Sequence, residues 1–252
     1  VHSQRQRRSP PIALESGHRR RPHQRGPPAR RFSSATAEAV AMAAVGLLYV
    51  GIVLFVNGLM LLGHIAPRGA APLNLFVGVL QCITPTYLII AANGDPTAIS
   101  AAAGLYLFGF TYLWVGINGI TDWPGTGLGW FSLAVAVSAV GFAFHSWAVL
   151  EDRAFAVIWA LWAVLWFSFF LLLGLGMDRI GATVGVLAAG EGILTAGIPG
   201  FLLIGGWWRD SGTLAVVLAI LGIALVLASV PLGRRLAAVP PPLSPHTSPA
   251  HS

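Results

Sequence analysis

The sequence has no lysine, only one cysteine and few charged residues. Charged residues make up 10% of its 252 residues, against about 25% in a typical soluble domain, so an ordinary soluble globule is excluded. The single cysteine, Cys82, excludes an internal disulfide and any cysteine-based metal cluster. The absence of lysine excludes a retinal photoreceptor, because retinal is held as a Schiff base on a lysine amine.

Apolar sequence is abundant instead. Hydrophobic residues make up 56% of the chain, and its mean hydropathy is +0.74. Seven apolar runs reach about 20 residues, the length of a helix that crosses the hydrocarbon core of a bilayer. These runs cover residues 43–63, 73–92, 98–119, 128–148, 155–176, 183–205 and 213–231. Because backbone groups in lipid must be hydrogen-bonded internally, the sequence predicts an all-α, polytopic membrane helical bundle.

The two ends of the chain differ from this apolar middle. Nine of the fifteen arginines lie in residues 1–31, and the segment after residue 239 is rich in proline. We expect residues 1–41 to be a disordered basic extension and residues 233–252 a disordered tail. A basic arm can bind nucleic acid or anionic lipid, whereas a secretory signal would need an apolar core that is missing here. We favour a spurious or disordered extension with Met42 as the true start, and no nucleic-acid partner.

The remaining arginines predict the orientation. Arg68 and Arg179 lie in connections on one side of the predicted bundle, with Arg234 and Arg235 after the seventh run, whereas Arg153 and Arg209 lie on the other side. Because cytoplasmic loops carry more arginine, the first side is predicted to be cytoplasmic. The first helix then begins outside, and the C-terminus lies inside if the extra helix predicted at 209–232 spans the membrane.

Several polar and aromatic residues lie inside the runs. Asn57 interrupts the first run, Tyr112 lies in the third, and Trp162 and Trp166 share one helical face in the fifth. Hydrogen bonding between helices and aromatic packing are their ordinary interpretations. Glu191 in the sixth run is harder to explain, because no basic residue occurs inside any run to pair with it. A carboxyl group at such depth costs about 2.5–3.5 kcal/mol on insertion scales and by default indicates a pathway or a binding site.

Four stretches carry a resemblance to a known family. They are "LLYVGIVLFVNG" (47–58), "LFGFTYLWVGIN" (107–118), "AVIWALWAVLW" (156–166) and "EGILTAGIP" (191–199). In this order they resemble the AmiS/UreI family of bacterial urea and short-chain amide channels, over a channel domain at 42–208. The resemblance implies six transmembrane helices per protomer, a homohexameric ring around membrane lipid, and one narrow pore in each protomer. It implies that the pore constrictions contain Leu47, Val50, Leu54, Asn57, Phe108, Tyr112, Trp162, Trp166 and Glu191.

The function that this resemblance implies is passive permeation of urea or short-chain aliphatic amides across the cell (inner) membrane. It implies no enzymatic activity and no cofactor, with a urease or an amidase in the same pathway. A slot between flat rings passes a planar solute and strips its water, so a few polar groups must replace the lost hydrogen bonds. Glu191 would accept hydrogen bonds from amide N–H groups or orient a tryptophan indole N–H.

Two features depart from the family pattern. The seventh run lies beyond the family core, and the loops predicted to lie outside are short, with only His145 near them. Because histidine is the side chain suited to sensing mild acid, we expect a flux that acid does not switch on. Two alternatives from other classes are a membrane-embedded enzyme, for which the runs lack a motif such as HExxH, and a non-conducting assembly partner.

Overall fold

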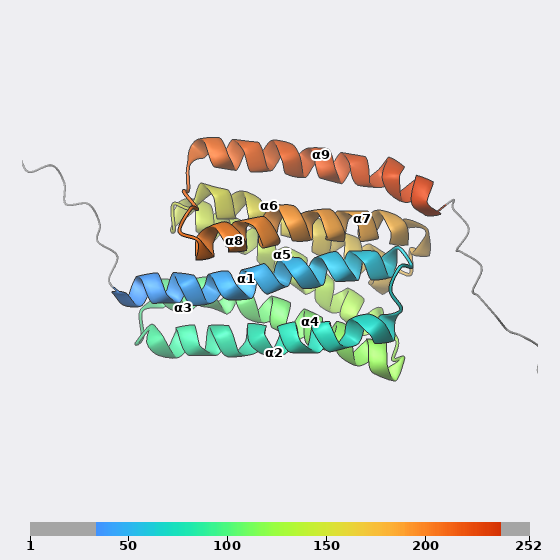
Figure 1. Ribbon diagram of the computed structural model, residues 1–252, viewed down its shortest axis with the longest axis horizontal. Helices are drawn as coiled ribbons and strands as arrows, with labels where there is room; N and C mark the ends of the chain where they lie inside the picture. The colour runs from blue at the N-terminus through green and yellow to red at the C-terminus, as the bar shows by residue number, and fades with distance from the viewer. Residues whose placement is uncertain (1–33, 238–252) are drawn as a thin grey trace, which may run out of the picture.

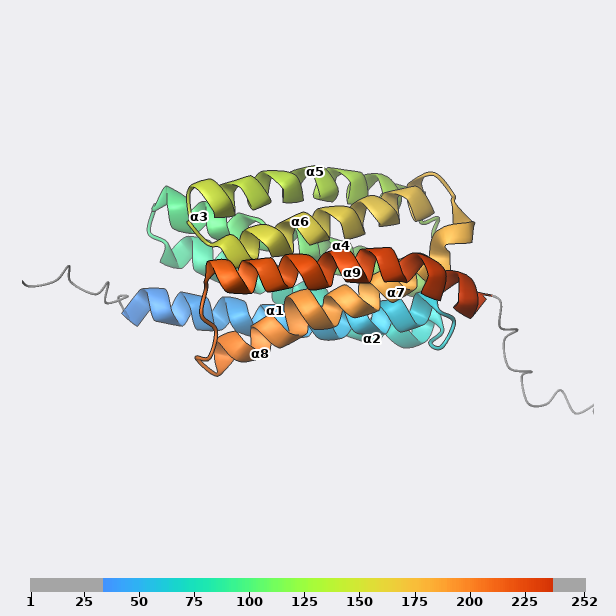
Figure 2. The same cartoon turned by 90° about the horizontal axis from the view of Figure 1, so that it is seen from above.

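The computed structural model describes residues 34–237, which are helical apart from short connections (Figure 1). Over this range, seven helical rods are long and apolar enough to cross a membrane. The rods lie side by side with their axes roughly aligned, as both Figure 1 and Figure 2 show. The predicted all-α bundle of six spans and a seventh is confirmed for this part of the chain.

Four of the rods are single α-helices, and the other three are interrupted. The single helices are α1 (Ser34–Leu61), α2 (Pro67–Ala91), α5 (Thr126–Ala148) and α9 (Gly212–Ala237). The third span consists of α3 (Pro96–Ala103) and α4 (Leu105–Thr121), and the fifth of α6 (Arg153–Phe169) and the π-helical η1 (Phe170–Gly174). The sixth consists of the 3-10 turn η2 (Asp178–Ile180), α7 (Gly181–Glu191), the π-helical η3 (Gly192–Gly197) and α8 (Ile198–Ile204).

Helix ends differ from two of the predicted boundaries. Helix α1 begins at Ser34, so residues 34–41 are helical although they were predicted to be disordered. Helix α9 continues to Ala237, past the predicted start of the tail at residue 233. Arg234 and Arg235 lie in its last turn, where the helix dipole favours a positive charge. The remaining parts of the two segments predicted to be disordered, residues 1–33 and 238–252, lie outside the described residues.

The connections gather at two ends of the bundle. The α1–α2, α4–α5 and η1–η2 connections lie at one end, which we call the Arg68 end after its ion pair with Asp122 at 3.0 Å. The α2–α3, α5–α6 and α8–α9 connections lie at the other end, which we call the Glu151 end. Because the number of spans is odd, α1 starts at the Glu151 end and α9 finishes at the Arg68 end.

Each helix packs against at least one neighbouring helix of the bundle. Helix α1 contacts both α2 and the rod formed by α7, η3 and α8, while α2 packs on α4 and α5 packs on α6. Helix α9 lies on the outside of α6 and α7, as both views show (Figure 2). The buried side chains of these spans form one core cluster, which includes Val50, Phe108, Trp162 and Leu187.

The sixth span leaves α-helical geometry directly after Glu191. Pro199 has no backbone N–H, so it cannot donate to the carbonyl of Thr195 in the usual way. The preceding segment, Gly192–Gly197, takes up π-helical turns, which within α-helices are frequent at functional sites. Glu191 and Thr195 are both fully buried in the bundle.

Candidate functional site

Four predicted aromatic residues meet inside the bundle. The ring of Phe108 on α4 makes edge-on contacts with Trp162 and Trp166 on α6, with ring centroids 4.7 and 5.1 Å apart. Tyr112, one turn further along α4, stacks on Phe108 at 6.5 Å. All four side chains are buried. Two helices far apart in the sequence therefore bring together the aromatic residues expected from the motifs.

Each of the two indole groups is fixed by a threonine. The Nε1–H of Trp162 donates to Thr195 Oγ1 at 2.8 Å, and that hydroxyl donates to the backbone carbonyl of Glu191 at 2.6 Å. The Nε1–H of Trp166 donates to Thr111 Oγ1 at 3.3 Å, and that hydroxyl donates to the carbonyl of Leu107 at 2.7 Å. Both indole planes are therefore anchored to the backbone of a neighbouring helix.

The carboxyl group of Glu191 takes no part in this anchoring. Its side chain is fully buried, and neither carboxyl oxygen accepts or donates a hydrogen bond within residues 34–237. Of its two predicted roles, orienting an indole N–H is wrong, because Thr195 performs it in contact with Trp162. The role that remains open to the carboxyl group is hydrogen bonding to a solute.

Helix α1 supplies an aliphatic face and one amide. Leu47, Val50 and Leu54 are spaced three and four residues apart, so they share a helical face, and all three lie in the core cluster with Phe108. Asn57 continues this face towards the Arg68 end.

Asn57 is bound to a partner on α2. Its Nδ2 donates to Asn74 Oδ1 at 2.9 Å, and Asn74 Nδ2 donates back to Asn57 Oδ1 at 2.7 Å. Asn74 also donates to the carbonyl of Ala70 at 3.0 Å. This reciprocal pair is the interhelical hydrogen bonding that is the ordinary interpretation of an asparagine in a span.

A cavity of about 360 Å³ leads into the site from the Arg68 end. It extends from the exposed Trp123 to the buried Tyr112 and Trp166. Four predicted site residues line it: Leu54, Asn57, Tyr112 and Trp166. The other five lie outside its walls, and four of them pack in the core cluster: Leu47, Val50, Phe108 and Trp162.

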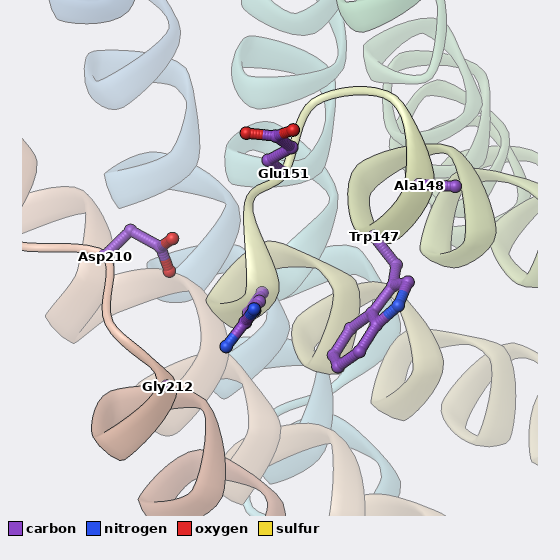
Figure 3. A pocket seen from close by; sticks show the side chains of 6 residues that line it. Trp147, Ala148, Glu151, Asp210 and Gly212 are labelled. Atoms are coloured by element: carbon purple, nitrogen blue, oxygen red, sulfur yellow. The ribbon is translucent and has the colours of Figure 1, made fainter.

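A second cavity, of about 520 Å³, lies at the Glu151 end (Figure 3). Figure 3 shows Trp147 and Glu151 on one side, and Asp210 and Gly212 on the segment that leads into α9. Asp210 Oδ1 accepts from the backbone N–H of Ala154 at 3.1 Å, and this bond ties that segment to the start of α6.

Asp152 caps α6 beside this second cavity. Its carboxyl group accepts from the N–H of Phe155 at 2.9 Å. Burial, and to a smaller extent the negative charge of Asp210, raise the pKa of Asp152 above its usual value. Within residues 34–237, no group of three or more histidine, cysteine or acidic side chains is placed to hold a metal ion.

The sequence led to no predicted site role for Thr111, Thr195 or Asn74. The signal in the sequence was a polar side chain within an apolar run. The partner of that side chain could not be predicted, because each of these hydrogen bonds joins two different spans.

A bundle of seven apolar spans with a buried aromatic cluster and a cavity leading to it fits a membrane transport protein. The chain belongs to the AmiS/UreI family of transporters, whose sequence model matches residues 42–207. It is therefore a multi-pass membrane protein of a transport family. Helix α9 lies beyond the matched residues.

Individual relatives are transporters and channels. A protein of Mycolicibacterium smegmatis described as an amidate substrates transporter is 58% identical over 205 residues, covering 80% of this chain and 96% of that protein. The transporter protein AmiS2 of Rhodococcus erythropolis is 49% identical over 193 residues, covering 75% and 94%. The Helicobacter pylori urea channel, solved in a closed state, is 35% identical, with a TM-score of 0.60 over 66% of this chain and all of that one.

Proposed function

We propose that this chain is a passive channel for small uncharged amides, with each protomer carrying its own pathway. The observation that carries the proposal is the buried set of Phe108, Trp162 and Trp166, with both indole groups held by hydrogen bonds, at the inner end of a cavity. Rings held in this way offer flat apolar walls without free N–H groups, which suits a planar solute.

Glu191 supplies polarity in this apolar section. A planar amide that enters between the rings loses water, and unless something replaces those hydrogen bonds its desolvation blocks passage. The unpaired carboxyl oxygens of Glu191 are acceptors that fit the N–H groups of an amide. No second aspartate, glutamate, histidine, lysine or arginine side chain is buried within residues 34–237, which favours downhill permeation over coupling to an ion.

Short-chain aliphatic amides are the solutes that we favour, with urea as a second substrate. This preference is supported by the chain's higher identity to the relative described as an amidate substrates transporter, at 58%, than to the urea channel of H. pylori, at 35%. We further propose a homohexamer in the inner membrane, with the Arg68 end in the cytoplasm. The arginine distribution and the family resemblance support these points.

Stopped-flow light scattering on proteoliposomes tests the proposal. The parent chain should take up acetamide and urea faster than empty liposomes. Glu191→Gln should slow both solutes by about threefold to tenfold, the range for a loss of about 1 kcal/mol when one of two acceptor oxygens is removed. Trp166→Ala should widen the pathway and raise the flux of butyramide relative to that of acetamide.

Trp130→Ala is the matched control. Trp130 is 54% exposed, and its only described ring contact is with Phe170, so its loss should leave both fluxes unchanged. If correctly folded parent protein conducts neither solute above the level of empty liposomes, the proposal is wrong. If acid switches the flux on, the expected independence of pH is wrong, and His145, whose ring lies 3.0 Å from Ser100 Oγ, is the first residue to change.

A further inference from the structure

Asn118 lines the cavity at the Arg68 end, and the family motifs assigned no role to it. Its Oδ1 is buried and has no hydrogen-bond partner in the described part of the chain. Asn57 lines the same cavity, but both ends of its amide are bound to Asn74. Of the two asparagines on these walls, Asn118 therefore has the free acceptor.

Tyr112 offers a second free group on the same helix. Its side chain is 1% exposed, its hydroxyl has no partner within residues 34–237, and it lines the deeper part of the cavity. Six residues separate it from Asn118, which is about 9 Å along the helix axis. A small amide cannot bridge that distance, so it would meet the two groups in turn.

The unpaired buried atoms share one chemical character. In the described range, the buried side-chain oxygens without a partner are those of Gln81, Tyr112, Asn118 and Glu191. Apart from the tyrosine hydroxyl, these are carbonyl or carboxyl oxygens, which accept hydrogen bonds. A primary amide has two N–H donors and one carbonyl acceptor. It therefore complements a set of groups in which most are acceptors and one, the tyrosine hydroxyl, can donate.

We propose that Asn118 is a specificity-determining residue that selects solutes with a free amide NH₂ group. Its Oδ1 accepts a hydrogen bond from the solute N–H at the first contact in the cavity, and the Tyr112 hydroxyl then donates to the solute carbonyl. This proposal rests on the proposed channel function and adds a requirement for N–H donors that size alone does not impose.

Two isomeric solutes separate this requirement from size. Propionamide and N-methylacetamide contain the same atoms, but propionamide has two N–H donors and N-methylacetamide has one. With the leak of empty liposomes subtracted, the parent should conduct propionamide about threefold to tenfold faster, the range expected for one hydrogen bond. Asn118→Leu, similar in shape without an acceptor, should slow propionamide and lower this ratio.

Two further variants, Asn118→Asp and Thr121→Val, serve as controls for Asn118→Leu. The aspartate keeps an acceptor at the same place and should keep the preference for propionamide. Thr121 is exposed on the same helix outside the cavity lining, and its hydroxyl is bound to the Ile117 carbonyl at 2.9 Å, so Thr121→Val should behave as the parent.

The outcomes are distinct. Equal fluxes of the two isomers through a parent that conducts acetamide would overturn the donor requirement while leaving the channel function intact, and this result needs no variant to fold. A parent-like ratio in Asn118→Leu would overturn the role of Asn118. A parent that conducts no amide at all would contradict the channel function, and this proposal with it.

Discussion

The rod formed by α7, η3 and α8 contacts α1 on one side and α9 on another, and the two contacts are built differently. Against α1 the backbones themselves meet: a Cβ on Gly51 would overlap the backbone of Gly197, and one on Gly192 would lie 2.8 Å from the Gly51 carbonyl oxygen. Against α9 the contact near the middle is between a glycine and a leucine tip, as at Gly190 and Leu225, and a glycine of α9 meets backbone near the end of that helix, where Gly233 lies against Thr183.

The two kinds of contact indicate different roles for the two sides of the rod. Helix α1 carries Leu47, Val50 and Leu54, and its backbone contact sets how far these side chains lie from Thr195. A backbone contact cannot yield without moving a whole helix, whereas a leucine tip can rotate. We infer that the contact with α1 fixes the position of the side chains along the pathway, whereas the contact with α9 tolerates substitution near its middle.

The largest expected effect comes from Gly51→Val. Its side chain would overlap the Gly197 backbone, so we expect α1 to separate from the rod and the protein to lose about 3 kcal/mol or more of unfolding free energy. Thermal denaturation in detergent, followed by circular dichroism, measures this loss. Gly141→Val is the control, because a Cβ at Gly141 meets nothing within 4 Å, and it should change stability by less than about 0.5 kcal/mol.

The second effect comes from Thr195→Val, which keeps the shape but removes the acceptor for the Trp162 indole. A buried N–H left without a partner costs about 1–3 kcal/mol, and the freed indole should lower the flux of acetamide. Denaturation and proteoliposome uptake measure both consequences. An unchanged stability would mean that the indole finds another partner.

A smaller effect is expected from Gly190→Ala, on the α9 side of the rod. The added methyl group meets the side-chain tip of Leu225, which can turn aside, so we expect a loss of about 1 kcal/mol or less and an unchanged acetamide flux. Gly51→Ala is the matched comparison. If the two alanine variants lost equal stability, the contrast between the α1 and α9 sides would be broken.

The smallest effect concerns pH at the Glu151 end, where Asp210 ties the segment before α9 to α6. Because the pKa of Asp152 is raised in the folded protein, the folded state binds a proton before the unfolded state does as pH falls. The contribution to stability is therefore present below the ordinary aspartate pKa and is lost as pH rises through the raised value.

Asp152→Asn should remove this pH dependence. Asparagine caps a helix as well as aspartate does, so the bond to the Phe155 N–H is expected to persist. At neutral pH the variant should be more stable by about 0.5 kcal/mol or less, as expected for partly exposed charges. Melting temperatures measured from neutral pH down to about pH 4 would show a flatter profile than the parent, and identical profiles would contradict the assignment.

The spans and most of the aromatic cluster followed from the sequence. Each apolar run has the length of a membrane helix, and the predicted runs lie within the observed spans apart from small differences at their ends. The motif that contains Trp162 and Trp166 put both on one face, and the structure places that face against Phe108. The predicted role of the Glu191 carboxyl in holding an indole was wrong, because the Trp162 indole donates to a threonine one turn later and the carboxyl oxygens have no partner in the described residues.

Hydropathy and residue spacing by themselves determined that this chain is a helical membrane bundle, which runs span the bilayer and which polar groups lie inside them. These are local properties, since a helix in lipid satisfies its own backbone and needs no neighbour to form. Only the tertiary structure decided which side-chain hydrogen bonds are made. The amide of Asn57 is paired and the Oδ1 of Asn118 is not, because a hydrogen bond between helices depends on how closely two distant segments approach.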